Sequence, residues 1–162
     1  MTALEDVTFP SPSSPTDSQG VEPFLAWLDF LRGAVLRKAL GLTAEQARWR
    51  PGGKLLPLAG LVNHLTNVER RWIDGVLLGG STFKDVSEYE APALPIELVI
   101  TAYRERAVAT AGVVRSLGDL EARSRDGKYD LRFVLLHLIN ETARHAGHAD
   151  AVRELLDGTV GE

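Results

Sequence analysis

The 162-residue sequence contains no cysteine. It can therefore form no disulfide, offer no thiolate to a metal ion and use no cysteine as a nucleophile. If the protein carries out thiol chemistry, the sulfur has to arrive with a second substrate.

The chain also lacks long apolar segments and dense runs of basic residues. No stretch approaches the roughly 18 consecutive apolar residues of a membrane-spanning helix, and the N-terminal residues lack the basic and then apolar order of a secretory signal. We therefore expect a cytoplasmic protein with no membrane partner. The net charge of −4, from 18 lysine and arginine residues against 22 aspartate and glutamate residues, disfavours a nucleic-acid partner.

Strand-like alternation and internal repeats are absent as well, and the pattern that the sequence does contain is helical. Apolar residues recur at intervals of three and four. These intervals predict four amphipathic helices, at about residues 22–40, 57–79, 95–117 and 131–156. Prolines near the first turns and glycines just after the ends agree with these limits. We therefore predict an all-α protein with the architecture of a four-helix bundle.

The segments outside these helices suggest a single domain with a tail. Residues 1–20 are rich in serine, proline and threonine, so we expect a flexible leader before one bundle domain of residues 21–162. Thr43 and Gln46 form a capping-box pattern that opens a short turn. Residues 80–94 have no sustained pattern, and we expect a loop that could cover one end of the domain.

Histidines are concentrated on two of the predicted helices. His137, His145 and His148 lie on the last one, and His64 lies at the margin of the apolar stripe of the second. Glu141 precedes His145 by four residues, so the two side chains lie one turn apart on the same side of their helix. Both are placed at the edge of the apolar stripe, where neither is simply solvated.

This pattern has two interpretations. His64, Glu141 and His145 could converge on one metal ion. Alternatively, His64 is a hydrogen-bonded packing residue and Glu141 pairs with Arg144. The residues alone leave both interpretations open.

Two of the motifs resemble a known family. The segment HLTNVERRWIDGVL, which begins at His64, and the segment LLHLINETARHAGHADAVRELLDG near the end are similar to the DinB-like superfamily, and most closely to its actinobacterial branch. The resemblance covers roughly residues 24–162. It implies a four-helix bundle with a divalent metal at one end, held by one histidine of the second helix and two residues of the fourth.

Carried over position by position, the resemblance implies His64, Glu141 and His145 as the metal ligands. A glutamate followed by a histidine is the arrangement of the mycothiol-dependent maleylpyruvate isomerases. Those enzymes have a further C-terminal domain with no counterpart in these 162 residues, so the resemblance does not imply isomerase activity itself. His148 stands where the family often has glutamine, and it could be a fourth ligand or a general base.

Two imidazoles and one carboxylate suit zinc best, and also nickel, cobalt, manganese or iron(II). Three protein ligands leave an open position, where an ion lowers the pKa of a bound water or thiol to about 7. We therefore predict a metal-dependent enzyme of mycothiol-type transfer or thiol-assisted isomerisation. His148 and His137 are then the candidates for acid–base catalysis, and Arg144 is the candidate for binding an anionic group. The alternative is a non-catalytic stress-response or binding bundle with a structural or vestigial metal site.

Surface residues suggest one further partner. Trp27, Trp49 and Trp72 offer enough apolar area for homodimerisation through an outer face. Arg70 and Arg71 are expected on or near the outer face of the second helix, in contact with solvent.

Overall fold

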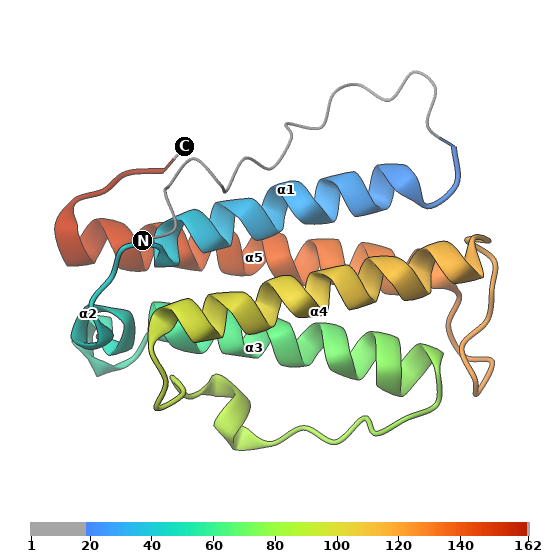
Figure 1. Cartoon of the computed structure of the whole chain (residues 1–162), viewed down its shortest axis with the longest axis horizontal. Coiled ribbons are helices and arrows are strands. Elements are labelled where there is room, and N and C mark those ends of the chain that lie inside the picture. Colours follow the sequence, from blue (N-terminus) through green and yellow to red (C-terminus); the bar gives the residue numbers. More distant parts are fainter. Residues whose placement is uncertain (1–18, 162) are drawn as a thin grey trace.

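Four long helices form the body of the structure, a computed structural model that describes residues 19–161 (Figure 1). They are α1 (Glu22–Ala39), α3 (Leu58–Arg70), α4 (Ile96–Leu117) and α5 (Leu131–Asp157). The all-α bundle prediction is confirmed, and the helices begin and end close to the predicted residues. Of the predicted leader, residues 1–18 lie outside the described part of the chain. Among the described helices, none is both long enough and apolar enough to cross a membrane.

Local capping explains several helix ends. The side chain of Asp130 accepts a hydrogen bond of 2.8 Å from a backbone N–H in the first turn of α5, which satisfies a donor that the helix itself leaves free. Thr43 and Gln46 make the predicted capping box at the start of the short helix α2 (Ala44–Arg48). Gly118 ends α4 in the left-handed region, with φ of 66°, which glycine adopts without steric cost.

The second predicted helix changes its winding part-way. After α3 the chain continues as a π-helical segment, η3 (Arg71–Leu77), of the kind often found at functional sites. The prediction that Arg71 contacts solvent on an outer face is wrong, because its side chain is only 15% exposed and pairs with Glu88 on the following connection. Arg70 is exposed, as predicted.

The connection between α3 and α4 runs back along the bundle, so that these two helices point in the same direction (Figure 1). This crossover connection, residues 78–95, contains a single 3₁₀ turn, η4 (Val86–Tyr89). Because the connection has to return along the length of α3, it places η4 in contact with α3.

Two apolar clusters fill the interior on either side of a buried polar layer. The first cluster includes Val35, Leu36, Leu61, Leu65, Ile100 and Val152. The second includes Leu25, Leu28, Val68, Ile73, Val114 and Leu135. Between them, Arg32 of α1 binds both carboxylate oxygens of Glu69 of α3 at 2.8 and 2.6 Å, and the Thr110 hydroxyl of α4 donates to Glu69 at 2.7 Å. The buried charges are thus paired and hydrogen-bonded, as low-dielectric surroundings require.

Candidate metal centre

The seam between α3 and α5 brings three possible metal ligands together. His64 projects from α3, and Glu141 and His145 project from α5, with one ligand atom of each within 4.8 Å of the other two. Nε2 of His145 lies 3.8 Å from a carboxylate oxygen of Glu141. The rings of His64 and His145 meet edge to face, with centroids 4.8 Å apart. Two helices distant in sequence therefore deliver two imidazoles and one carboxylate to a common point.

Burial keeps both imidazoles neutral. His64 is 4% exposed and His145 is 8% exposed. Burial, together with the neighbouring His145, lowers the pKa of His64 to about 4. Burial and the adjacent His148 likewise lower the pKa of His145. Since neutral imidazole is the form that ligates metal ions, neither ring has to lose a proton at pH 7 before binding one.

The donor set fits a divalent cation. Arg144 approaches Glu141 only to 3.8 Å, and its side chain is 60% exposed, so this contact satisfies the carboxylate poorly and gives the ion-pair interpretation little support. Nδ1 of His64 is buried and has no hydrogen-bond partner in the described part of the protein, which disfavours the interpretation of His64 as a satisfied packing residue. Two imidazoles and one carboxylate with no competing thiolate match zinc and related transition metals.

The position of this cluster differs from the expectation of a site at one end of the bundle. Glu141 and His145 lie near the middle of α5 (Leu131–Asp157), and His64 lies midway along α3 (Leu58–Arg70). The site therefore opens on the side of the bundle, along the seam that the crossover connection borders.

The other predicted site residues line the same cavity, of about 500 Å³. His148 is exposed, and its Nδ1 lies 3.3 Å from Nδ1 of His145; it is not among the three converging residues that could hold an ion. His137 packs against Trp72, with ring centroids 4.1 Å apart, and burial lowers the pKa of His137. Arg144 stands at the exposed edge of the cavity.

Trp72 therefore lines this cavity rather than an outer surface. Trp27 and Trp49, at 47% and 37% exposed, remain on the outside of the molecule. Homodimerisation stays a prediction that rests on these two residues.

The crossover connection supplies residues that the sequence did not single out. The ring of Tyr89 stacks on His64, with centroids 4.6 Å apart and planes inclined by 22°. Lys84 and Glu88 approach the site from the same connection. No spacing rule links these residues to His64, because only the return path of the chain brings them together. The one available signal is Asn63, whose side chain holds the connection by donating to backbone carbonyls at 3.2 to 3.4 Å.

Comparison with known families identifies the family of the chain. The family model described as mycothiol-S-transferase matches residues 24–158. The chain belongs to the mycothiol-S-transferase family. This is a DinB-like actinobacterial family, so the resemblance seen in the sequence motifs is confirmed. A search of curated proteins found no significant match. All three converging side chains lie within the residues that the mycothiol-S-transferase model covers.

Proposed function

We propose that the protein transfers a low-molecular-weight thiol of the mycothiol type to a small electrophile, at a divalent metal ion held by His64, Glu141 and His145. The observation that carries this proposal is the convergence of these three side chains, within 4.8 Å of one another, in a chain of a mycothiol-related transferase family. Zinc is the ion that the donor set favours, with nickel, cobalt, manganese and iron(II) as the alternatives.

When bound there, such an ion supplies Lewis acidity that lowers the pKa of a thiol or water to about 7. The chain itself contributes no cysteine, so no internal thiolate competes for the open coordination position. The co-substrate then brings the sulfur, and the side chains of the protein orient the reactants and provide the charged groups that bind them.

The remaining side chains of the cavity have separate tasks in this proposal. His137 is neutral at pH 7 because burial lowers its pKa, so its ring can accept the proton that the thiol releases. His148, 3.3 Å from His145, orients that ligand and offers a second proton acceptor at the exposed edge. Arg144 and Lys84, at 60% and 53% exposed, attract an anionic group on the electrophile.

Metal analysis of untagged protein tests the first part. We expect about one equivalent of zinc after reloading, and an affinity reduced in Glu141→Ala by more than the roughly 10–100-fold that loss of a supporting residue causes. Glu154→Ala is the matched control, since Glu154 is an exposed carboxylate on the same helix and should leave the affinity unchanged. Less than about a tenth of an equivalent of any transition metal in the wild-type protein would contradict the proposal.

A conjugation assay tests the second part. Zinc-loaded protein should accelerate the disappearance of mycothiol in the presence of a fluorogenic alkylating reagent. The acceleration should be lost in Glu141→Ala and retained in Glu154→Ala. Full metal binding without thiol turnover would favour the alternative, a binding or stress-response bundle with a structural metal.

A further inference from the structure

We propose that Glu88 is a positioning residue for His64: its carboxylate accepts a hydrogen bond from Nδ1–H of that ring and so fixes which nitrogen faces the metal site. The effect on metal affinity rests on the function proposed above, whereas the effect on the ring tautomer does not. Glu88 is not one of the three converging ligands, so it acts through His64.

The first argument is that two buried polar atoms without hydrogen-bond partners among the described residues lie close together, although Nζ of Lys84 also approaches the Glu88 oxygen to 4.0 Å. Nδ1 of His64 and Oε1 of Glu88 lie 3.9 Å apart, and each side chain is 5% exposed. Neither atom has a hydrogen-bond partner among the described residues. Since an unpaired buried polar group is unfavourable, a small contraction to about 3 Å satisfies both atoms at once.

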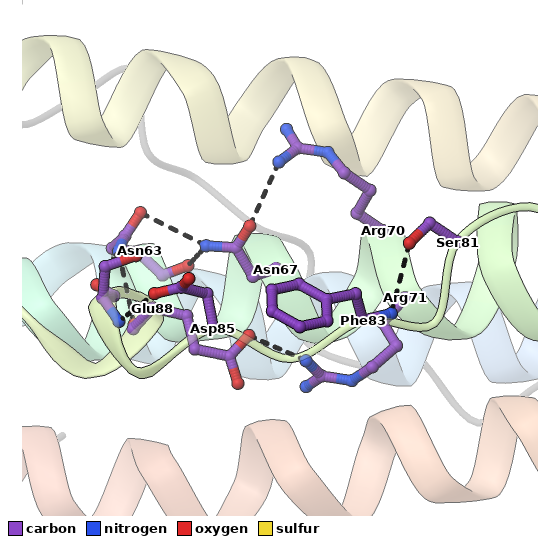
Figure 2. Close-up of a pocket in the computed structure, with 9 residues that line it drawn as sticks. Asn63, Asn67, Arg70, Arg71, Ser81, Phe83, Asp85 and Glu88 are labelled. Carbon is purple, nitrogen blue, oxygen red and sulfur yellow. Dashed lines mark hydrogen bonds and ion pairs between the residues drawn. The ribbon is translucent and has the colours of Figure 1, made fainter.

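The second argument is that the other contacts of Glu88 keep it in place. Its Oε2 accepts a hydrogen bond from the guanidinium of Arg71 at 2.7 Å, and Figure 2 shows this contact where the crossover connection passes α3. Asn63 donates to the backbone carbonyl of Glu88 at 3.2 Å. Because Asn63 precedes His64 in sequence, the ligand-bearing helix itself holds the carboxylate against the ligand.

The third argument is chemical. A metal-bound histidine usually donates its second N–H to a carboxylate, carbonyl or water, and this bond sets both tautomer and ring orientation. With Nδ1–H directed to Glu88, the lone pair of His64 is on Nε2, where it can face an ion. His145 has a comparable arrangement, since its Nε2 faces Glu141 and its Nδ1 lies 3.3 Å from His148.

Glu88→Gln is the discriminating substitution because it removes one of two needed acceptors. The carboxylate serves Arg71 with one oxygen and His64 with the other. A glutamine has a single amide oxygen, which the charged guanidinium of Arg71 retains. The amide NH₂ then faces Nδ1 of His64, which has to accept, and the ring proton moves to Nε2.

The experiment is long-range ¹H–¹⁵N NMR of the metal-free protein at pH 7.5, combined with zinc competition against a chromophoric chelator. We expect His64 of the wild-type protein to carry its proton on Nδ1, and His64 of Glu88→Gln to carry it on Nε2. Zinc affinity should fall about 10–100-fold in Glu88→Gln, with an unchanged helical circular dichroism spectrum. Glu90→Gln, an exposed neighbour on the same connection, should match the wild-type protein in both measurements.

A wild-type His64 protonated on Nε2, or a Glu88→Gln protein with unchanged tautomer and zinc affinity, would overturn the inference. If no variant and no wild-type protein binds zinc, the proposed function fails. The tautomer comparison then still decides the role of Glu88, so the two failures are distinguishable.

Discussion

Glu69 places a carboxylate in the centre of the bundle, and the guanidinium of Arg32 compensates its buried negative charge. Both side chains are 1% exposed and are joined by two hydrogen bonds. Such a pair contributes little net stability compared with apolar residues of similar size, but loss of one member leaves an uncompensated buried charge. The pair also joins α1 to α3 between the two apolar clusters.

We predict that Arg32→Met lowers the free energy of unfolding by about 3–5 kcal/mol, measured by urea denaturation. The double variant Arg32→Met/Glu69→Leu should recover most of this loss, because it removes both buried charges together. Arg132→Met, which breaks the exposed pair with Glu121, should change little. A double variant no more stable than the single one would show that the pairing argument is wrong.

Among the elements, η3 (Arg71–Leu77) and the turn after it determine where the crossover connection begins. Gly75 lies against the returning chain, so that a Cβ atom there would be 2.5 Å from the carbonyl oxygen of Ser81. Backbone atoms cannot move away as the end of a flexible side chain can. A glycine is therefore needed at this contact for steric reasons.

We predict that Gly75→Ala lowers the free energy of unfolding by about 1–3 kcal/mol through this clash. Gly112→Ala on α4 is the matched control, because Gly112 is exposed and its added Cβ would meet nothing within 4 Å. That variant should gain about 0.5–1 kcal/mol, since alanine favours a helix over glycine. Equal stabilities of the two variants in urea denaturation would refute the steric argument.

At the scale of the whole molecule, acid sensitivity follows from histidines on two packed helices. Burial is the first cause of the lowered pKa of His64, His137 and His145. An unfolded chain titrates its histidines near 6.5. Below that pH the histidines of the unfolded state bind protons, whereas those of the folded state stay neutral. The free energy of unfolding therefore falls as the pH falls toward the pKa values of the folded state.

We therefore predict that the free energy of unfolding of metal-free protein drops by about 1–3 kcal/mol between pH 7.5 and pH 5. His64→Gln should reduce the drop, because burial lowers the pKa of His64 to about 4, well below that of a histidine in an unfolded chain. Some carboxylates also have a lowered pKa, such as those of Asp85 and Asp126. Their protonation lowers the stability of the protein only below about pH 4, the usual pKa of an aspartate, which is outside this pH range. Urea denaturation at both pH values, in the presence of a chelator, gives the measurement, and equal stabilities would rule the explanation out.

Helix positions could be predicted from the sequence because they depend on short-range periodicity, whereas the candidate trio of His64, Glu141 and His145 followed from the family resemblance. Glu141 and His145 are four residues apart, so any helix through them places both side chains on one side. His64 lies at the margin of the apolar stripe that turns α3 toward its neighbours. The motifs around these residues also carried the family resemblance, which the mycothiol-S-transferase match over residues 24–158 bears out.

The surroundings of the trio were decided by tertiary structure alone. Arg71 was expected in solvent because the sequence does not show the π-helical winding of η3 or the chain that covers it. Glu88 and Tyr89 reach His64 because α3 and α4 are parallel, which forces their connection back along α3 (Figure 1). Helical periodicity acts over a few residues and therefore specifies the elements and their faces. The direction in which a long connection returns depends on how whole helices pack, and only that packing placed a carboxylate beside the ring of His64.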